Sequence, residues 1–368
     1  MSDVKSFTEK VVGRLHTIGQ QLLNKNFQRI HLGSSSIYAK AYSISTPFSA
    51  ISFDGVDATI AEAFQWHSAQ AQPTYFFDFE RRALIDPLTG WLLSSNRLIV
   101  ESVPYAVEFR VGNPSFSAYR FRKKRRVSFT EAATIRFNWG NYWHFFNDAL
   151  GQLCMMDDFH VPFATPIVVP EYVQRIPFVE EAFRRTAWLS GRRWIFPNAD
   201  TWVEADRWYF CKSSPPQINY LRRILDHLQV SNPENEAEKL IFVSRENSDQ
   251  RHIENQSEIE AIAQAAGLMV IEPRSLSLDE QISRFSGARL VVGPHGAGLT
   301  NILFRGHGPL LLFELFPQDY IKPYYFWLSR LLGQRYSAMT GSRLVDGRFW
   351  VDPKLFQSRL AELLAQLQ

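Results

Sequence analysis

Apolar runs and amphipathic stretches alternate regularly in the second half of the chain, from residue 238 onward. The apolar runs predict buried strands, and the stretches between them, with apolar residues every three or four positions, predict helices. The expected strands cover residues 239–245, 268–273, 289–293, 309–316 and 335–340, and the expected helices cover residues 255–267, 277–288, 297–304 and 320–333. Strands that alternate with helices at this spacing form right-handed crossovers in a parallel sheet. Residues 238–345 are therefore predicted to form a Rossmann-like domain.

The first half of the chain carries weaker signals of the same kind. Short strand-like runs occur at residues 97–103, 133–137, 164–170 and 192–197, and helical patterns occur at residues 9–24, 141–156 and 217–229. A chain of 368 residues is also longer than a single core usually grows. We therefore expect an α/β protein with a second α/β domain over residues 1–230, joined by the polar linker 231–239. The last segment, residues 346–368, ends in a helix that could pack back on this first domain.

Composition excludes several classes of protein. The hydrophobic fraction of 45% argues against disorder, and a formal charge of +3 is too small to indicate a nucleic-acid partner. Cys154 and Cys211 fit neither a zinc site nor a disulfide framework, so both are expected to be buried thiols in a reducing compartment. The sequence has no signal-peptide pattern and no apolar run of about 18 residues. These features predict a cytoplasmic protein.

One basic cluster stands out, residues 119–128, with six Lys or Arg side chains at positions 120–126 and aromatic residues among them. Such a run could bind an anionic polysaccharide, lie on the inner face of an acidic membrane, or contact nucleic acid. Most such runs, however, are simply a solvated edge or loop. A peripheral membrane contact through residues 120–126 is the partner we keep open, and no nucleic-acid partner is expected.

The stretch "VVGPHGAGLTNILF", residues 291–304, places glycines between a predicted strand and a predicted helix. Such a turn exposes backbone N–H groups at the positive end of a helix, and glycine lets phosphate oxygens approach the backbone. The donors expected to hold a diphosphate are His295, Gly296, Ala297, Gly298, Leu299, Thr300 and Asn301. A turn built only for packing is the alternative. A dehydrogenase fingerprint is disfavoured, because Asn301 replaces its third glycine and the motif follows the third strand rather than the first.

Three charged residues are expected beside this turn. Arg245 ends the first predicted strand of the domain, Arg251 follows in the same loop, and Glu314 lies near the end of the fourth predicted strand. These residues lie at the carboxyl ends of the strands, and ligands of open α/β sheets bind at that edge of the sheet. The arginines could hold phosphate oxygens, and the glutamate could accept both ribose hydroxyls. Glu314 as a helix cap or an ion-pair partner is the alternative.

The segment "RFNWGNYWHFFNDALGQL", residues 136–153, places polar groups among aromatic ones. His144 and Asp148 are four residues apart, so on a helix they share a face and could form a base with its orienting partner, or two separate catalytic groups. An aromatic core helix with one satisfied histidine is the alternative. The acceptor-side candidates in this segment are Asn138, Asn141 and Trp143.

These motifs resemble those of glycosyltransferase family 61. The similarity covers roughly residues 135–320, and "GPHGAGLTN" is its most specific part. The resemblance implies a GT-B architecture, with two Rossmann-like domains facing a central cleft. It also implies an inverting transfer from a nucleotide-sugar donor, often a UDP-sugar, with no cofactor and no required metal. Bacterial relatives act in capsule and polysaccharide biosynthesis, on glycan or lipid-linked saccharide acceptors.

The resemblance and the residues together give a mechanism to test. Asp148 is the expected base, with His144 as the alternate, while Arg245, Arg251 and the glycine turn hold the diphosphate and Glu314 holds the ribose. No DxD metal motif is present, so no metal ligands are expected. The main alternative is a degenerate transferase fold that binds a glycan or a nucleotide without turnover. A nucleic-acid-binding protein is a third and weaker alternative.

Overall fold

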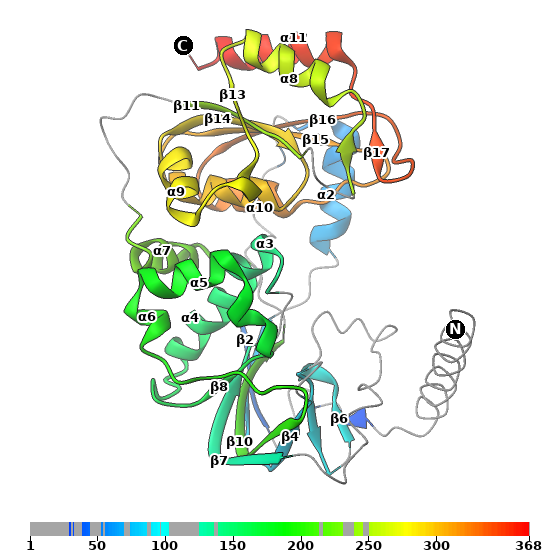
Figure 1. Ribbon diagram of the computed structural model, residues 1–368. Helices are drawn as coiled ribbons and strands as arrows, with labels where there is room; N and C mark the ends of the chain where they lie inside the picture. Colours follow the sequence, from blue (N-terminus) through cyan, green and yellow to red (C-terminus); the bar gives the residue numbers. More distant parts are fainter. Residues whose placement is uncertain are drawn as a thin grey trace, which may run out of the picture.

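A computed structural model gives the fold of the chain (Figure 1). It describes residues 29–30, 32, 39–44, 53, 56–69, 74–86, 90–95, 97–102, 125–135, 139–212, 216–230, 239–245 and 250–367. The helix expected at residues 9–24 and most of the linker 231–239 lie outside this part. Among the described residues, no helix is both long enough and apolar enough to cross a bilayer.

The C-terminal domain is built on a parallel five-stranded sheet, as the sequence predicts. Its strands run in the order β13-β11-β14-β15-β16, and every neighbouring pair is parallel. The strands are β11 (Lys239–Val243), β13 (Met269–Ile271), β14 (Ala288–Pro294), β15 (Leu311–Phe316) and β16 (Arg335–Thr340). In sequence order this is 2-1-3-4-5, a doubly wound arrangement. The prediction of a Rossmann-like domain is confirmed for this half.

Helices follow these strands in the predicted order, and local sequence explains where they begin. The helices are α8 (Gln256–Ala265), η6 (Pro273–Ser275), α9 (Leu278–Ser286), η7 (Ala297–Arg305), α10 (Tyr324–Leu331) and α11 (Pro353–Ala365). Ser277 and Glu280 form a capping box at the start of α9, and Asp352 caps α11 ahead of its first-turn proline. The helix after the glycine turn, η7, is a 3-10 helix. A short ladder of β12 (His252–Ile253) and β17 (Arg348–Phe349) lies beside the main sheet.

The two faces of this sheet are covered differently (Figure 1). α8 and α11 pack together on the outer face, where Phe356, Leu360 and Leu363 join the core of the domain. The prediction that the C-terminal helix packs on the first domain is therefore wrong. The apolar side of α11 instead covers the outer face of the five-stranded sheet that precedes it in the chain.

A helix from the N-terminal half crosses to the C-terminal domain instead. α2 (Ala58–Ala69) lies against the inner face of the five-stranded sheet (Figure 1). Its buried Phe64 stacks on Phe326 at 4.8 Å between ring centroids and meets the edges of Phe316 and Tyr336. The predicted boundary of the first domain, residues 1–230, therefore does not hold for this helix.

The N-terminal half has a larger, mixed sheet. Its strands are β1 (Arg29–Ile30), β2 (Ala39–Ile44), β3 (Thr74–Phe79), β4 (Ala83–Ile85), β5 (Leu92–Ser94), β6 (Arg97–Ile99), β7 (Arg125–Thr134), β8 (Ile167–Val168), β9 (Trp194–Ile195) and β10 (Thr201–Lys212). The central strand β10 pairs parallel with β7 but antiparallel with β3 and β4. This half is α/β as expected, but its mixed sheet is not a Rossmann fold.

Helices cover one side of this sheet and face the C-terminal domain (Figure 1). They are α3 (Tyr142–His144), the π-helical turn η4 (Phe145–Ala149), α4 (Leu150–Asp158), η5 (Glu171–Arg175), α5 (Pro177–Arg185), α6 (Ala187–Ser190) and α7 (Ile218–His227), with η2 (Val100–Ser102) elsewhere in the half. The helix predicted at residues 141–156 is thus present with a π-turn in its middle. Cys154 on α4 and Cys211 on β10 are free, buried thiols, as predicted.

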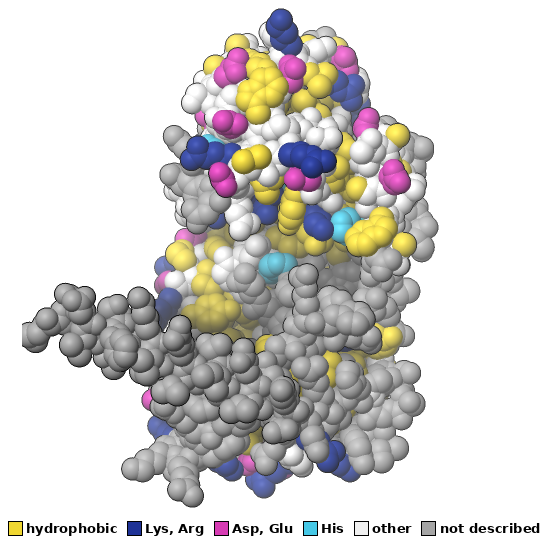
Figure 2. All heavy atoms as spheres, turned by 90° about the vertical axis from the view of Figure 1, so that its right-hand side faces the viewer, with side chains coloured by type: hydrophobic (Ala, Val, Ile, Leu, Met, Phe, Trp, Pro, Cys, Tyr) yellow, Lys and Arg dark blue, Asp and Glu magenta, His cyan; other side chains and the backbone are white. Residues whose placement is uncertain are grey.

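The basic cluster is described only at its end. Residues 119–124 lie outside the described residues, while Arg125 and Arg126 begin β7 and are exposed. The membrane contact proposed for this cluster stays a prediction. On the face shown in Figure 2, the described Lys and Arg side chains are interspersed with acidic and hydrophobic ones.

Candidate active site

The topology of the five-stranded sheet marks one edge as the ligand site. In a 2-1-3-4-5 sheet, the chain leaves the first and third strands toward opposite faces, which opens a crevice at their carboxyl ends. Here these strands are β11 and β14, which are neighbours. β11 is followed by Ser244 and Arg245, and β14 by His295, Gly296 and the start of η7. Both sequence motifs predicted for the donor thus meet at the switch point.

The glycines of the turn are required by close approaches. A Cβ atom on Gly293 would lie 2.9 Å from the Cβ atom of Val243, and one on Gly298 would lie 2.9 Å from Cγ1 of the same valine. A Cβ atom on Gly296 would lie only 1.4 Å from Nη1 of Arg245. Gly293 and Gly298 are therefore required for packing, which agrees with the alternative of a turn built only for packing. Gly296 serves the arginine, because its missing side chain is the space that the guanidinium crosses.

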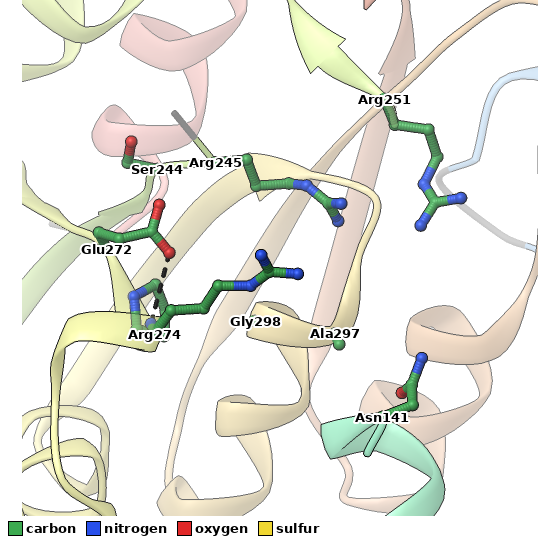
Figure 3. Close-up of a pocket in the computed structure, with 9 residues that line it drawn as sticks. Asn141, Ser244, Arg245, Arg251, Glu272, Arg274, Ala297 and Gly298 are labelled. Atoms are coloured by element: carbon green, nitrogen blue, oxygen red, sulfur yellow. Dashed lines mark hydrogen bonds between the residues drawn. The ribbon is translucent and has the colours of Figure 1, made fainter. Parts of the chain in front are cut away.

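Three arginines converge on a small cavity at this edge (Figure 3). The cavity has a volume of about 130 Å³, and its lining residues are Asn141, Ser244, Arg245, Arg251, Glu272, Pro273, Arg274, Ala297 and Gly298. Figure 3 shows the guanidinium groups of Arg245, Arg251 and Arg274 pointing into the same space. The only carboxylate among the residues that line this cavity is that of Glu272. The lining therefore has a net positive charge, as a site for a polyvalent anion requires.

The backbone of the glycine turn holds two of these arginines in place. The carbonyl oxygen of His295 accepts hydrogen bonds from Nη1 of Arg245 and from Nε of Arg251, both at 3.1 Å. Burial lowers the pKa of Arg245 to about 10, and the charges of Arg251 and Arg274 contribute. Arg245 is therefore still cationic at neutral pH. The mutual repulsion of these cations would be relieved by a bound anion.

The side chain of His295 is held by a carboxylate rather than offered to the cavity. Nδ1 of His295 lies 2.6 Å from Oε1 of Glu314, and the hydroxyl of Tyr336 donates to Oε2 at 2.6 Å. Burial lowers the pKa of His295, although the charge of Glu314 opposes the shift. Glu314 is fully buried, with both oxygens engaged in this way. This position fits the ion-pair alternative for Glu314, and the predicted ribose contact stays a prediction.

The later residues of the turn are also inside the protein. Leu299, Thr300 and Asn301 are buried, and only Ala297 and Gly298 of this stretch line the cavity. The amide nitrogen of Asn301 donates to Gln281 and to the carbonyl oxygen of Gly298, and its Oδ1 accepts from the hydroxyl of Tyr142. This burial does not fit the side-chain contacts predicted for Thr300 and Asn301, whereas the backbone N–H contacts expected around Gly296 to Asn301 stay a prediction. Asn301 instead connects the two halves of the protein.

His144 and Asp148 form a pair, as their spacing predicts. Nδ1 of His144 hydrogen-bonds Oδ2 of Asp148, and the side-chain amide of Asn147 donates to Oδ1 of Asp148 at 2.6 Å. The side chain of His144 is 23% exposed and that of Asp148 only 8%. With Nδ1 carrying the proton toward the carboxylate, the other ring nitrogen, Nε2, has the lone pair. The histidine is therefore the more accessible member of the pair.

The acceptor-side candidates differ in their surroundings. Asn138 lies outside the described residues. Oδ1 of Asn141 caps α3 by accepting from the backbone N–H groups of Trp143 and His144, and this residue also lines the arginine cavity. Trp143 is buried against Tyr324 and Tyr325 on α10. Trp143 is therefore a packing residue and is not exposed to an acceptor.

Two tyrosines at the start of α10 connect the two motifs. The ring of Tyr324 lies 6.1 Å from that of His295 and 6.2 Å from that of Trp143, and Tyr325 lies 5.3 Å from each of the same two rings. Tyr324 is 39% exposed. Burial raises the pKa of its hydroxyl, with the charges of Tyr320 and Asp148 contributing. The histidine–aspartate pair and the glycine turn therefore lie on either side of Tyr324.

Sequence reasoning missed three residues of this site: Glu272, Arg274 and Tyr324. Glu272 directly follows β13, so the rule that selected Glu314 at a strand end also applies to it. Arg274 is two residues further on, in η6. Tyr324 carries no comparable sequence signal, because only the packing of α10 between the halves brings it there.

Among the described residues, no group of three or more His, Cys, Asp or Glu side chains is arranged to hold a metal ion. The positive charge at the site comes from arginines. The arrangement can thus bind an anion beside a histidine that is able to take up a proton.

No curated protein matches the sequence. A structural comparison finds E. coli heptosyltransferase WaaC with ADP at 9% sequence identity and a TM-score of 0.31, with 66% of this chain and 99% of that chain covered. Similarity at this level indicates neither a shared substrate nor a shared reaction.

The family comparison is more specific. Residues 142–310 match the model of the family described as Glycosyltransferase 61. The match begins at α3, and it includes the histidine–aspartate pair, the arginines after β11 and the whole glycine turn. Over residues 142–310, this chain is therefore similar to the glycosyltransferases of family 61.

Proposed function

We propose that this glycosyltransferase transfers a sugar from a nucleotide-sugar donor, with a UDP-sugar as the first candidate, to a glycan or lipid-linked saccharide. The observation that carries the proposal is the convergence of Arg245, Arg251 and Arg274 on one cavity at the switch point (Figure 3). Guanidinium groups bind phosphate oxygens with forked, charge-assisted hydrogen bonds. The diphosphate of the donor lies in this cavity, between the two halves of a GT-B-like arrangement.

His295 and Glu314 act in this proposal through position. Glu314 fixes the ring of His295, and the carbonyl oxygen of His295 orients Arg245 and Arg251. A neutral His295 whose Nδ1–H donates a hydrogen bond to Glu314 has no proton on Nε2 to donate to a phosphate. The hydrogen bonds to the phosphate are therefore donated by the arginines rather than by this imidazole.

The geometry supports His144, rather than Asp148, as the general base. Its Nε2 can take the proton of an acceptor hydroxyl, while Asp148 holds Nδ1 and stabilises the imidazolium that forms. Asp148 is the less suitable base because it is more buried and both of its oxygens accept hydrogen bonds. Attack by the deprotonated hydroxyl displaces the diphosphate from the opposite face of the sugar, so the transfer inverts the anomeric centre.

The charge that develops on the leaving diphosphate is stabilised by the arginines in a partly enclosed site. We propose on this basis that the transfer needs no metal. The resemblance is to family 61, whose bacterial members act in polysaccharide biosynthesis, and on this ground we propose an acceptor in surface polysaccharide assembly.

The test is a kinetic comparison of variants with UDP-sugars as donors. His144→Ala is expected to lower kcat by about 10²–10⁴-fold, the usual contribution of a general base, with nucleotide affinity unchanged. Added imidazole should restore part of the turnover of His144→Ala but none of that of Asp148→Ala. Normal turnover of His144→Ala, or rescue of Asp148→Ala by formate, would assign the base to Asp148 instead. Absence of turnover with every nucleotide sugar would favour a binding protein.

A further inference from the structure

A second, larger cavity opens beside the arginine cavity. Its volume is about 390 Å³, within the roughly 300–1,000 Å³ range of small-molecule sites. The two cavities share five lining residues: Asn141, Pro273, Arg274, Ala297 and Gly298. The two cavities therefore adjoin along this shared wall, and one ligand could extend from one into the other. The mechanism above does not use this second cavity.

The walls of this cavity come from both halves of the protein. Tyr142, Phe178 and Glu181 come from α3 and α5, while Leu276, Leu278 and Gln281 come from the start of α9 and the residues before it. The rings of Tyr142 and Phe178 meet edge to face at 5.1 Å between centroids. The cavity is thus lined by aromatic and aliphatic side chains, against which the face of an aromatic group could pack.

The polar side chains that line this cavity but not the arginine cavity belong to Tyr142, Glu181 and Gln281. The amide of Gln281 is engaged at both ends, by Leu276 and by Asn301. The carboxylate of Glu181 accepts from the backbone N–H of Leu278 through Oε2. A carboxylate has about four acceptor sites, so Glu181 can accept a further N–H donor from a ligand.

We infer that this second cavity is the nucleoside subsite, in which the base lies against Phe178 and donates an N–H to Glu181. The inference rests on the proposed function, because it requires a nucleotide donor. Arg274 stands at the junction of the two cavities, where a nucleoside joins its diphosphate. Glu181 is then a determinant of nucleotide recognition contributed by the N-terminal half.

The direction of the ligand follows from what lies on the other side of the arginines. Arg251 packs its guanidinium 5.0 Å from the centroid of the Tyr320 ring, and Tyr320 lies 5.9 Å from the ring of His295. Tyr324 and the His144–Asp148 pair continue from there. The reacting sugar belongs on that side, so the nucleoside belongs on the side of Arg274. Nucleoside, diphosphate and sugar thus occupy successive parts of the boundary between the halves.

The test compares nucleoside diphosphates with inorganic pyrophosphate, by titration calorimetry on the full chain. UDP, CDP, GDP and ADP are each measured, and the tightest of them should bind at least about tenfold more strongly than pyrophosphate, since stacking of one base contributes about that much. Glu181→Gln keeps an oxygen for Leu278 but loses the charge. It should weaken the nucleoside diphosphate at least about fivefold and leave pyrophosphate unchanged.

Two further variants separate recognition from folding. Phe178→Ala should weaken only the nucleoside diphosphate, and its unchanged affinity for pyrophosphate shows that the arginine cavity is intact. Glu180→Gln removes the same charge from the neighbouring, exposed position on α5 and should change neither affinity. Equal binding of pyrophosphate and every nucleoside diphosphate, or an equal loss of both in Glu181→Gln, overturns the nucleoside subsite but leaves the proposed transferase. Failure of pyrophosphate and all nucleotides to bind overturns both.

Discussion

At the scale of single residues, Gly296 and Arg245 form one functional unit. The guanidinium reaches the carbonyl oxygen of His295 only by crossing the space where any other residue at position 296 would carry its Cβ atom. The sequence suggests a glycine that exposes its backbone to phosphate. The structure shows a glycine that leaves space for an arginine, so under the proposed function the arginine side chain makes the phosphate contact.

Gly296→Ala is therefore expected to act like Arg245→Ala. Displacing or removing a charged hydrogen-bond donor costs about 1.5–3 kcal/mol, or roughly 10–100-fold in affinity for a nucleoside diphosphate. The double variant should bind no more weakly than Arg245→Ala alone, because both changes remove the same contact. Calorimetry on the three variants checks this. Wild-type affinity in Gly296→Ala would mean that Arg245 does not hold the ligand.

Two glutamates at the same edge of the sheet differ in their exposure to the cavity. Glu272 and Glu314 both lie at the carboxyl edge of the sheet, one after β13 and one within β15. Only the fold decides which is exposed to the cavity, because β15 is covered on both faces and β13 is an edge strand. Sequence position predicts the edge of the sheet but not the burial of a side chain there.

At the scale of elements, α2 is the least expected feature. Its sequence, residues 58–69, shows no strong amphipathic pattern and lies far from the strands it covers. Nothing local indicates that its aromatic side will meet residues some 250 positions later. By contrast, the five strands of the parallel sheet and the helices between them were predictable, because each carries its own periodicity, and α9 and α11 also carry capping residues.

The contribution of α2 can be measured with two neighbouring aromatic residues. Phe64→Ala is expected to lower the free energy of unfolding by about 3–5 kcal/mol, as for other large aromatic side chains removed from a core. Trp66→Ala, on the same helix but 61% exposed, should change it by less than about 0.5 kcal/mol. Urea denaturation of both variants provides the comparison. Equal effects would show that α2 is not part of the C-terminal core.

At the scale of the whole molecule, the two halves share one core. A single cluster of buried side chains extends from α4 and the π-turn to η7, α9 and α10. Phe146 and Phe304 meet across the boundary at 5.5 Å, and Tyr142 bonds Asn301 nearby. Separating the halves widely would expose this apolar surface. Closure on the substrates is therefore expected to be a limited movement at the cavities, not a large domain rotation.

Sugar transfer at this site is expected to need no metal ion. Because arginines from β11, its following loop and η6 supply the positive charge, sugar transfer is expected to continue unchanged in excess EDTA. Added Mg²⁺ or Mn²⁺ should also fail to restore the affinity lost in Arg245→Ala. Radiolabelled or coupled transfer assays with and without chelator measure this. Turnover that disappears in EDTA and returns with a divalent cation would contradict a metal-free mechanism.

The sequence by itself determined the parallel domain, its strand order along the chain, the glycine turn and the pairing of His144 with Asp148, because each depends on residues close together in the chain. Tertiary structure alone decided that Glu314 is buried, that α11 stays with its own sheet and that α2 crosses to it. It also decided that Arg274 and Glu181 meet at adjoining cavities. These features depend on which surfaces exclude water from one another, and burial of that kind is a property of distant segments packed together.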